Sequence, residues 1–172
     1  MRLFFSETQL RHSPQQFLAA GRIVAPFEVP ERAERMAAGL RELGLNVEAP
    51  DDYGLAPIEH VHADHYVRFL QTAYAEFQAL GSAGPEVLPN VHPYVGARPD
   101  LSVHERPRAE GIIAHAGWYA GDMACAIGAG TSAGVYASAQ AAIAAARAVV
   151  DGAEEAMALC RPPGHHAYQD RS

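Results

Sequence analysis

Two adjacent histidines, His165 and His166, are the residues of this sequence best suited to chemistry. They end the segment RPPGHH at residues 161–166, in which two prolines restrict the backbone and the glycine permits a turn. Imidazoles gain and lose a proton near neutral pH, so one of two neighbours can stay charged while the other transfers a proton. The segment therefore predicts general acid–base catalysis, whereas a His-His pair outside such a setting is more often a polar turn in solvent.

A second histidine-rich segment, HVHADH at residues 60–65, matches the pattern HxHxDH that binds zinc in hydrolases of the metallo-β-lactamase fold. In those hydrolases the pattern follows an apolar strand and lies in a loop. Here Pro57 and Glu59 interrupt any buried strand, and an amphipathic helical pattern follows. Asp64 then falls in the first helical turn, where a carboxylate favours the helix dipole. We expect structural or surface roles for this segment and keep a zinc site as the alternative.

The elements that position these residues alternate between strand and helix patterns. Strands are predicted at residues 2–6, 45–50 and 154–160, and helices at residues 30–43, 63–80 and 132–151. The apolar face of the second helix consists of Val67, Leu70, Tyr74 and Phe77. This order predicts an α/β fold with crossover helices and a parallel sheet. The segment RPPGHH then lies at the carboxyl edge of the sheet, where open α/β folds bind ligands.

Two stretches lack a regular pattern. Residues 8–28 are expected to be irregular, because prolines and glycines interrupt them. Residues 81–117 form a long connection rich in proline, glycine and histidine. A connection of that length is unusual inside a compact domain, so we expect it to be functional, disordered or used between subunits.

The composition is that of a globular protein, with 172 residues, 49% hydrophobic and 19% charged side chains. All 13 basic residues are arginines and the net charge is -7, which makes nucleic acid an unfavourable partner and suits a cationic ligand. The apolar stretch at residues 132–150 contains Gln140 and Arg147 and is expected to be a soluble helix, not a membrane span. Two separate cysteines, Cys125 and Cys160, and the lack of a signal-peptide pattern predict reduced thiols in the cytoplasm, with Cys160 as inert packing.

The segment LCRPPGHHA resembles the tandem-histidine motif of the histone deacetylase superfamily. The segments FFSE, APFEVPERAERM, VHADHYVRFL and GWYAGDMACAIGAGT resemble its acetylpolyamine amidohydrolase branch, so that the likeness covers nearly the whole chain apart from residues 81–110. The resemblance implies an arginase/deacetylase-like α/β fold, a parallel sheet with flanking helices, of which residues 1–172 form the N-terminal portion of a single domain. It also implies zinc-dependent removal of acetyl groups from acetylated polyamines or similar small amines. The family's dimers use an inserted loop, and residues 81–117 would be that loop in a homodimer of this chain.

The same resemblance implies roles for single residues. His166 would take a proton from the attacking water and return it to the leaving amine, and His165 would act electrostatically. Glu110 and Asp122 would attract the substrate ammonium, and Trp118 and Tyr119 would line the entrance; ordinary surface acids and core aromatics are the alternatives. Relatives also carry an acid near position 17, where Phe17 stands here, so a preference for polyamine length is not predicted.

Family members place their zinc ligands and a catalytic tyrosine after the tandem histidines. Because this sequence ends at Ser172, the resemblance assigns no metal ligand within it, and we expect the 172 residues alone to be inactive. Two alternatives remain. One is a non-catalytic protein that binds a partner through the exposed edge of its sheet, and the other is a protein lysine deacetylase with a wider entrance.

Overall fold

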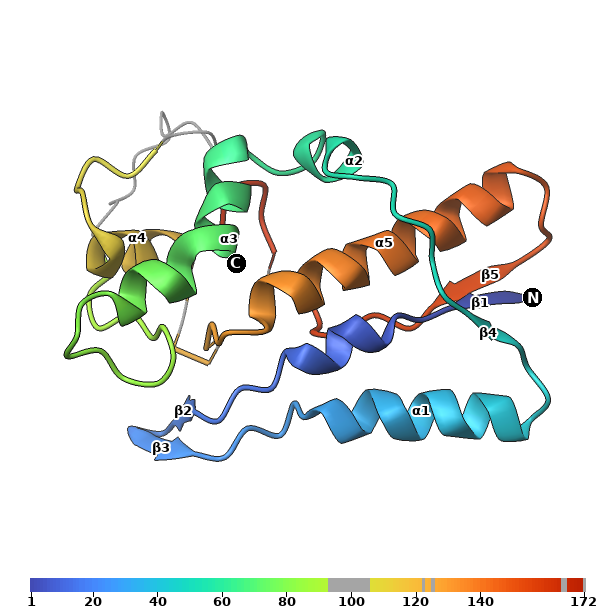
Figure 1. Ribbon diagram of the computed structural model, residues 1–172, viewed down its shortest axis with the longest axis horizontal. Coiled ribbons are helices and arrows are strands. Elements are labelled where there is room, and N and C mark those ends of the chain that lie inside the picture. Colours follow the sequence, from blue (N-terminus) through green and yellow to red (C-terminus); the bar gives the residue numbers. More distant parts are fainter. Residues whose placement is uncertain (93–105, 122, 125, 165–166, 172) are drawn as a thin grey trace. The chain divides into compact units, whose positions relative to one another are not determined.

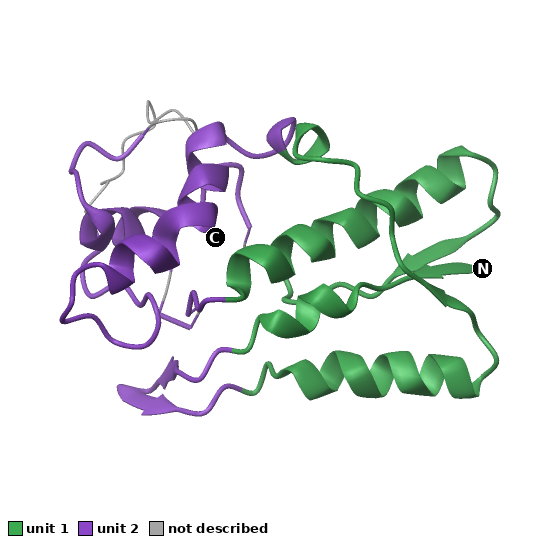
Figure 2. Ribbon diagram, in the orientation of Figure 1, with its two compact units in different colours: residues 1–13, 27–58, 130–163 green, residues 14–26, 59–129, 164–172 purple. Residues whose placement is uncertain are grey.

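The computed structural model describes residues 1–92, 106–121, 123–124, 126–164 and 167–171. Their contacts group the chain into two compact units, each assembled from three separate segments (Figure 2). Unit 1 comprises residues 1–13, 27–58 and 130–163, and unit 2 comprises residues 14–26, 59–129 and 164–172. The expectation of a single domain over residues 1–172 stays a prediction.

Unit 1 is built on a parallel sheet of three short strands in the order β4-β1-β5. These strands are β1 (Arg2–Phe4), β4 (Val47–Glu48) and β5 (Ala156–Ala158). In the central strand, Leu3 is the register partner of Val47 on one side and of Met157 on the other. All three lie within the predicted strands, and the predicted parallel arrangement is confirmed.

Two helices cover the two faces of this sheet (Figure 1). Successive residues of a strand point to opposite faces, so Phe4 packs with α5 (Thr131–Val150) and Phe5 packs with α1 (Pro30–Glu42). Pro30 is the first residue of α1, where a missing N–H costs no hydrogen bond, and Gly44 follows the helix with a φ of 77°. Both helices agree with the sequence pattern.

By length and composition alone, α5 is apolar enough to cross a membrane. In unit 1 it instead lies against the strands and buries a face of small residues, namely Ala137, Ala141, Ala144 and Ala148. Gln140 on the same helix accepts a hydrogen bond from the Tyr53 N–H at 2.8 Å and donates to the Gly54 carbonyl at 3.2 Å. Such pairing of a buried amide is the behaviour of a helix in a protein core.

Unit 2 contains the hairpin of β2 (Phe17–Ala19) and β3 (Arg22–Val24) and the helices α3 (Asp64–Gln78) and α4 (Ile112–Tyr119). A short helix, α2 (Ala56–Glu59), precedes α3 in the chain. An isolated antiparallel bridge joins Val87 to Ile127. The core of this unit consists of Tyr66, Phe69, Ala73, Phe77, Val87, Ile112, Ala116, Tyr119 and Ile127.

Three local predictions need correction. Within the stretch expected to be irregular, the hairpin forms, and so does the 3-10 helix η1 (Glu7–Arg11), whose Thr8 N–H is capped by the Ser6 hydroxyl. The stretch at residues 81–117 ends in helix, because α4 begins at Ile112. Of the predicted apolar face of α3, Val67 and Phe77 are buried as expected, and Leu70 and Tyr74 are half-buried. The buried face is wider than predicted, because it also includes Tyr66, Phe69 and Ala73.

Candidate functional site

The segment that carries the tandem histidines leaves the sheet beside the segment that follows β1. Parallel neighbours end at the same edge, and the Leu159 N–H donates to the Phe4 carbonyl at 2.9 Å. From η1, the Gln9 amide donates to the Leu159 carbonyl at 3.1 Å and accepts from the Arg161 N–H at 2.5 Å. Gln9 is 0% exposed, and its amide continues the pattern of backbone pairing beyond the end of β5.

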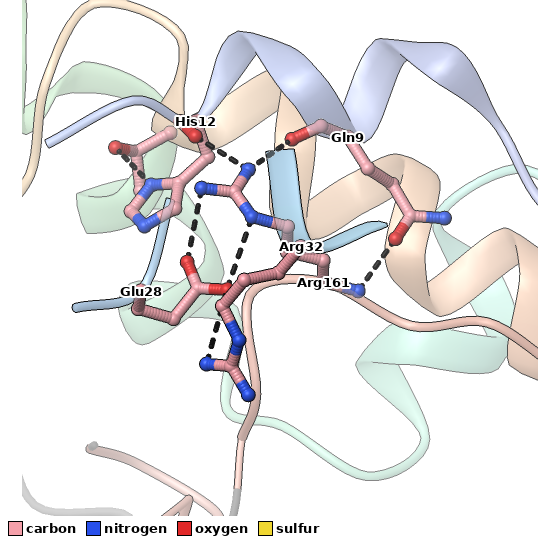
Figure 3. Close-up of polar contacts among 6 residues, drawn as sticks. Gln9, His12, Glu28, Arg32 and Arg161 are labelled. Carbon is pink, nitrogen blue, oxygen red and sulfur yellow. Dashed lines mark hydrogen bonds and ion pairs between the residues drawn. The ribbon is translucent and has the colours of Figure 1, made fainter. Parts of the chain in front are cut away.

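The Arg161 guanidinium, which is 3% exposed, is enclosed by oxygen acceptors (Figure 3). Its Nη1 donates to the carbonyls of Gln9, at 3.0 Å, and His12, at 2.5 Å. Its Nε donates to Glu28 Oε1 at 3.0 Å, and Nη2 forms an ion pair with Glu28 Oε2 at 2.9 Å. A buried charge is tolerated when it is paired and hydrogen-bonded, and the bidentate contact with a carboxylate supplies both conditions. Arg32 of α1 also approaches Glu28, at 4.0 Å.

His12 lies between this guanidinium and the start of α5. Its Nδ1 is 2.9 Å from Thr131 Oγ1, and its side chain is buried. Burial, with the neighbouring charge of Arg161, lowers the pKa of His12 to about 4. The imidazole is therefore neutral at pH 7, which leaves Glu28 as the charged partner of Arg161 within this cluster.

Small residues at the start of α5 allow η1 to approach closely. A Cβ added at Gly130 would lie 1.9 Å from the Arg11 carbonyl oxygen, and one at Gly134 would lie 2.9 Å from His12 Cβ. Neither distance is possible without a shift of the backbone or of the histidine. The position of η1, and with it the Gln9–Arg161 contacts, thus depends on two glycines of α5.

Of the predicted substrate-binding residues, Tyr119 lies in the core of unit 2. Its ring centroid is 4.6 Å from that of Phe69, and its hydroxyl is 2.9 Å from His65 Nδ1. Burial raises the pKa of Tyr119 to about 12. Trp118 is half-buried against the same core, and Glu110 is exposed just before α4. Asp122 and the predicted catalytic pair, His165 and His166, lie outside the described residues, and all six assignments stay predictions.

The side chains of the HxHxDH segment contact separate partners instead of converging on one point. His62 Nδ1 is 3.1 Å from the Tyr168 carbonyl, Asp64 forms an ion pair with Arg106 at 3.0 Å, and His65 contacts Tyr119. Among the residues that the structure describes, no group of three or more His, Cys, Asp or Glu side chains could hold a metal ion.

The segment does contact the chain that follows the tandem histidines. The Ala63 N–H donates to the Gln169 carbonyl at 2.9 Å, next to the contact between His62 and Tyr168. Asp64 begins α3, as predicted, and the His65 N–H together with the Arg106 guanidinium holds the pKa of its carboxyl below the ordinary value. The structural role expected for this segment is therefore the one these contacts favour.

The sequence patterns did not identify Gln9, His12 or Glu28 as neighbours of the RPPGHH segment. A usable signal existed for the first two, because parallel pairing of the first and last strands places residues 7–12 at the edge where Arg161 begins. Glu28 follows an irregular stretch, and no local pattern indicates its partner. Cys160 is exposed, with its Sγ 3.5 Å from the Ser138 carbonyl, so the expectation that it is packed in the core was wrong. Desolvation raises the pKa of its thiol, which agrees with the expected inertness.

Comparison with known proteins identifies the family. The model of the histone deacetylase domain matches residues 26–172. The chain belongs to the histone deacetylase family. Among its relatives in this family, it is 42% identical to an acetylpolyamine amidohydrolase of Burkholderia pseudomallei and 36% identical to one of Mycoplana ramosa, each over 99% of its own length. It is 33% identical to acetylpolyamine amidohydrolase 2 of Pseudomonas aeruginosa, again over 99% of the chain.

These relatives are longer than the chain, which spans 47%, 48% and 47% of them, respectively. Solved structures support the same fold of the histone deacetylase family. The acetylpolyamine aminohydrolase from Burkholderia pseudomallei matches with a TM-score of 0.89 over 100% of this chain and 48% of its own. The HDA15 HD domain matches with a TM-score of 0.62 over 99% of this chain and 38% of its own; at 18% identity it shows the fold alone. The predicted deacetylase-like fold and the family resemblance are confirmed.

Proposed function

We propose that the protein is an amidohydrolase that removes acetyl groups from acetylated polyamines or similar small amines. One observation carries the proposal: the tandem-histidine segment follows β5 in a chain that is 42% identical, over 99% of its length, to an acetylpolyamine amidohydrolase. The fold supports it, because the carboxyl edge of a parallel sheet is where such folds bind ligands.

In this proposal the reaction is hydrolysis of an acetamide. Water attacks the acetyl carbonyl carbon, the C–N bond breaks, and the products are acetate and an ammonium. His166 removes the proton from the water and delivers it to the leaving nitrogen, while His165 stabilises the negative charge that develops on oxygen. Glu110 and Asp122 favour a substrate with a second, positively charged amine, and Trp118 and Tyr119 shape the entrance.

Zinc is the metal that this family implies, and the described residues do not fit it. They bring together no group of three His, Cys, Asp or Glu side chains that could hold a metal. The proposal therefore assigns no described residue to zinc and derives no step through it.

The proposed setting is a cytoplasmic homodimer that acts on a small-molecule substrate, without nucleic acid or membrane. The net charge of -7 and the absence of lysine support a cationic substrate over a polyanionic one. The buried alanine face of α5 supports a role for that helix inside a folded protein. The homodimer follows from the family resemblance, and light scattering of the purified protein would measure it.

The test compares two substrates on the complete protein, acetylputrescine and an acetyl-lysine peptide. We expect acetylputrescine to have the higher kcat/KM. A His166→Ala variant should lose at least about a hundredfold in kcat, because general acid–base catalysis contributes about that much. A matched His60→Ala variant, at an exposed histidine, should keep wild-type activity. Full activity in His166→Ala would overturn the proposed mechanism, and a preference for the peptide would indicate a protein lysine deacetylase.

A further inference from the structure

We propose that Arg161 is a positioning residue that fixes the start of the tandem-histidine segment through its contacts with Glu28 and Gln9. The inference deepens the proposed function and rests on it. It concerns a residue that contacts neither substrate nor the reacting atoms in the proposal and that acts through His165 and His166.

Both the main chain and the side chain of Arg161 are fixed by their contacts. The main-chain N–H is bound by Gln9 Oε1, and three guanidinium N–H groups donate to oxygen acceptors within 3.0 Å. The remaining nitrogen, Nη2, forms an ion pair with Glu28 at 2.9 Å. These acceptors come from two distant segments, η1 with the residue after it and the chain before α1. A surface arginine that only improves solubility would not be 3% exposed with so many partners.

The two prolines after Arg161 transmit this constraint toward the histidines. Pro162 and Pro163 follow Arg161 directly, and each proline ring fixes one backbone dihedral. Proline also restricts the residue that precedes it. The direction of the backbone at Arg161 therefore restricts the direction of the chain through the two prolines as far as Gly164. The histidines follow Gly164 directly in the sequence. A change of about 1 Å in the position of a catalytic group can reduce a rate by about a hundredfold.

The contacts of Arg161 require the shape of a guanidinium. A lysine ammonium has one nitrogen, which cannot face the Glu28 carboxylate and the carbonyls of Gln9 and His12 together. Arginine at this position is not informative by itself, because every basic residue of the chain is arginine. The geometry of the contacts carries the inference.

The experiment uses Arg161→Lys and Glu28→Asp in the complete enzyme, and Arg2→Lys as a matched control. Arg2 and Glu48 form the same kind of bidentate pair in the same unit, with Nε 3.2 Å from Oε1, but Arg2 is exposed and far along the chain from the histidines. We expect kcat on acetylputrescine to fall by about tenfold or more in both cluster variants, with KM changed less than about threefold and with a shifted pH profile of kcat. Arg2→Lys should match the wild type.

A second readout does not depend on turnover. The Cε1–H signals of His165 and His166 in NMR spectra, assigned with His→Gln variants, should move in Arg161→Lys and stay unchanged in Arg2→Lys. If the wild type hydrolyses neither substrate, the proposed function fails while these signals still decide the inference. If Arg161→Lys does not fold, Glu28→Asp gives the result. Folded cluster variants with wild-type kcat, wild-type pH profile and unmoved signals would overturn the inference.

Discussion

At the scale of single residues, the main finding is that a neutral histidine and a charged arginine share one buried cluster. The Arg161 guanidinium forms an ion pair with Glu28, while burial, together with that neighbouring guanidinium, lowers the pKa of His12 and leaves it neutral at pH 7. The sequence contains nine histidines, and their spacing does not distinguish this one. Its protonation depends on contacts between residues that are far apart in the sequence, so no local pattern could predict it.

The lowered pKa of His12 predicts how stability depends on pH. The pKa is about 4 in the folded protein and 6.5 in an unfolded chain, so between these values only the unfolded state takes up the proton. Stability should therefore fall as the pH is lowered from 6.5 to 4, by up to about 3 kcal/mol from this group, and should not fall further below 4. Urea unfolding of the wild type and of His12→Asn at several pH values measures the difference. Asparagine can keep the contact with Thr131 but cannot titrate.

Other titrating groups contribute equally to the pH dependence of the free energy of unfolding in both proteins, so their contributions cancel in the comparison. The prediction concerns the slope of the free energy of unfolding against pH and not its absolute value, because His12→Asn also removes packing contacts. Equal slopes for the two proteins between pH 6.5 and pH 4 would show that folding does not lower the pKa of His12.

Gln9 carries a second prediction at this scale. Replacement by leucine keeps the volume but leaves the Leu159 carbonyl and the Arg161 N–H buried without partners. We expect a loss of about 3 kcal/mol in the free energy of unfolding, since each orphaned group costs roughly 1–3 kcal/mol. Gln78→Leu is the matched control, because its amide makes a similar bond to the Gly84 carbonyl at an exposed site. A similar loss of unfolding free energy in Gln9→Leu and Gln78→Leu would mean that the burial of the Gln9 hydrogen bonds does not increase their contribution to stability.

At the scale of elements, the contact between η1 and α5 depends on residues without side chains. Gly134→Ala should destabilise the protein, although alanine favours helix by about 1 kcal/mol, because its Cβ would meet His12 Cβ at 2.9 Å. Gly39→Ala in α1 has no atom within 4 Å of the new Cβ and should stabilise the protein by about 0.5–1 kcal/mol. Thermal unfolding of the two variants should give melting temperatures that move in opposite directions. A rise for both would show that η1 can shift without cost.

The sequence predicts those elements best whose signal is local. The helix α1 begins at Pro30 and is followed by Gly44, the alanine-rich α5 is followed by Gly152, and β1 lies in a short apolar run. The elements that were missed, η1 and the β2–β3 hairpin, are short and interrupted by proline or glycine. The buried face of α3 is wider than predicted because the apolar residues on that helix cover more than one face, and the partner helix α4 was not expected.

At the scale of the whole chain, each compact unit joins segments that are far apart in the sequence. The register of β1 and β5 pairs Arg2 with Ala156, so unit 1 cannot form until most of the chain has been made. The order of strand and helix patterns predicted the parallel sheet, but it did not predict that the first and last strands are neighbours. The candidate site shows the same limit. The RPPGHH segment can be recognised in the sequence, but the residues that contact Arg161 come from distant segments and cannot.

This topology predicts a hierarchy of hydrogen exchange. The Phe5 and Leu159 amides bond across the sheet of unit 1, to the Glu48 and Phe4 carbonyls, and should exchange only when that unit unfolds. The three residues of β3 are exposed, and its hairpin should open locally at a much lower free energy. Phe4→Ala removes a buried ring and should cost about 3 kcal/mol, which speeds exchange of the sheet amides about a hundredfold and leaves the hairpin amides unchanged. Exchange followed by mass spectrometry on peptides from both regions measures this, and equal acceleration in the two regions would mean that the hairpin opens only with the sheet.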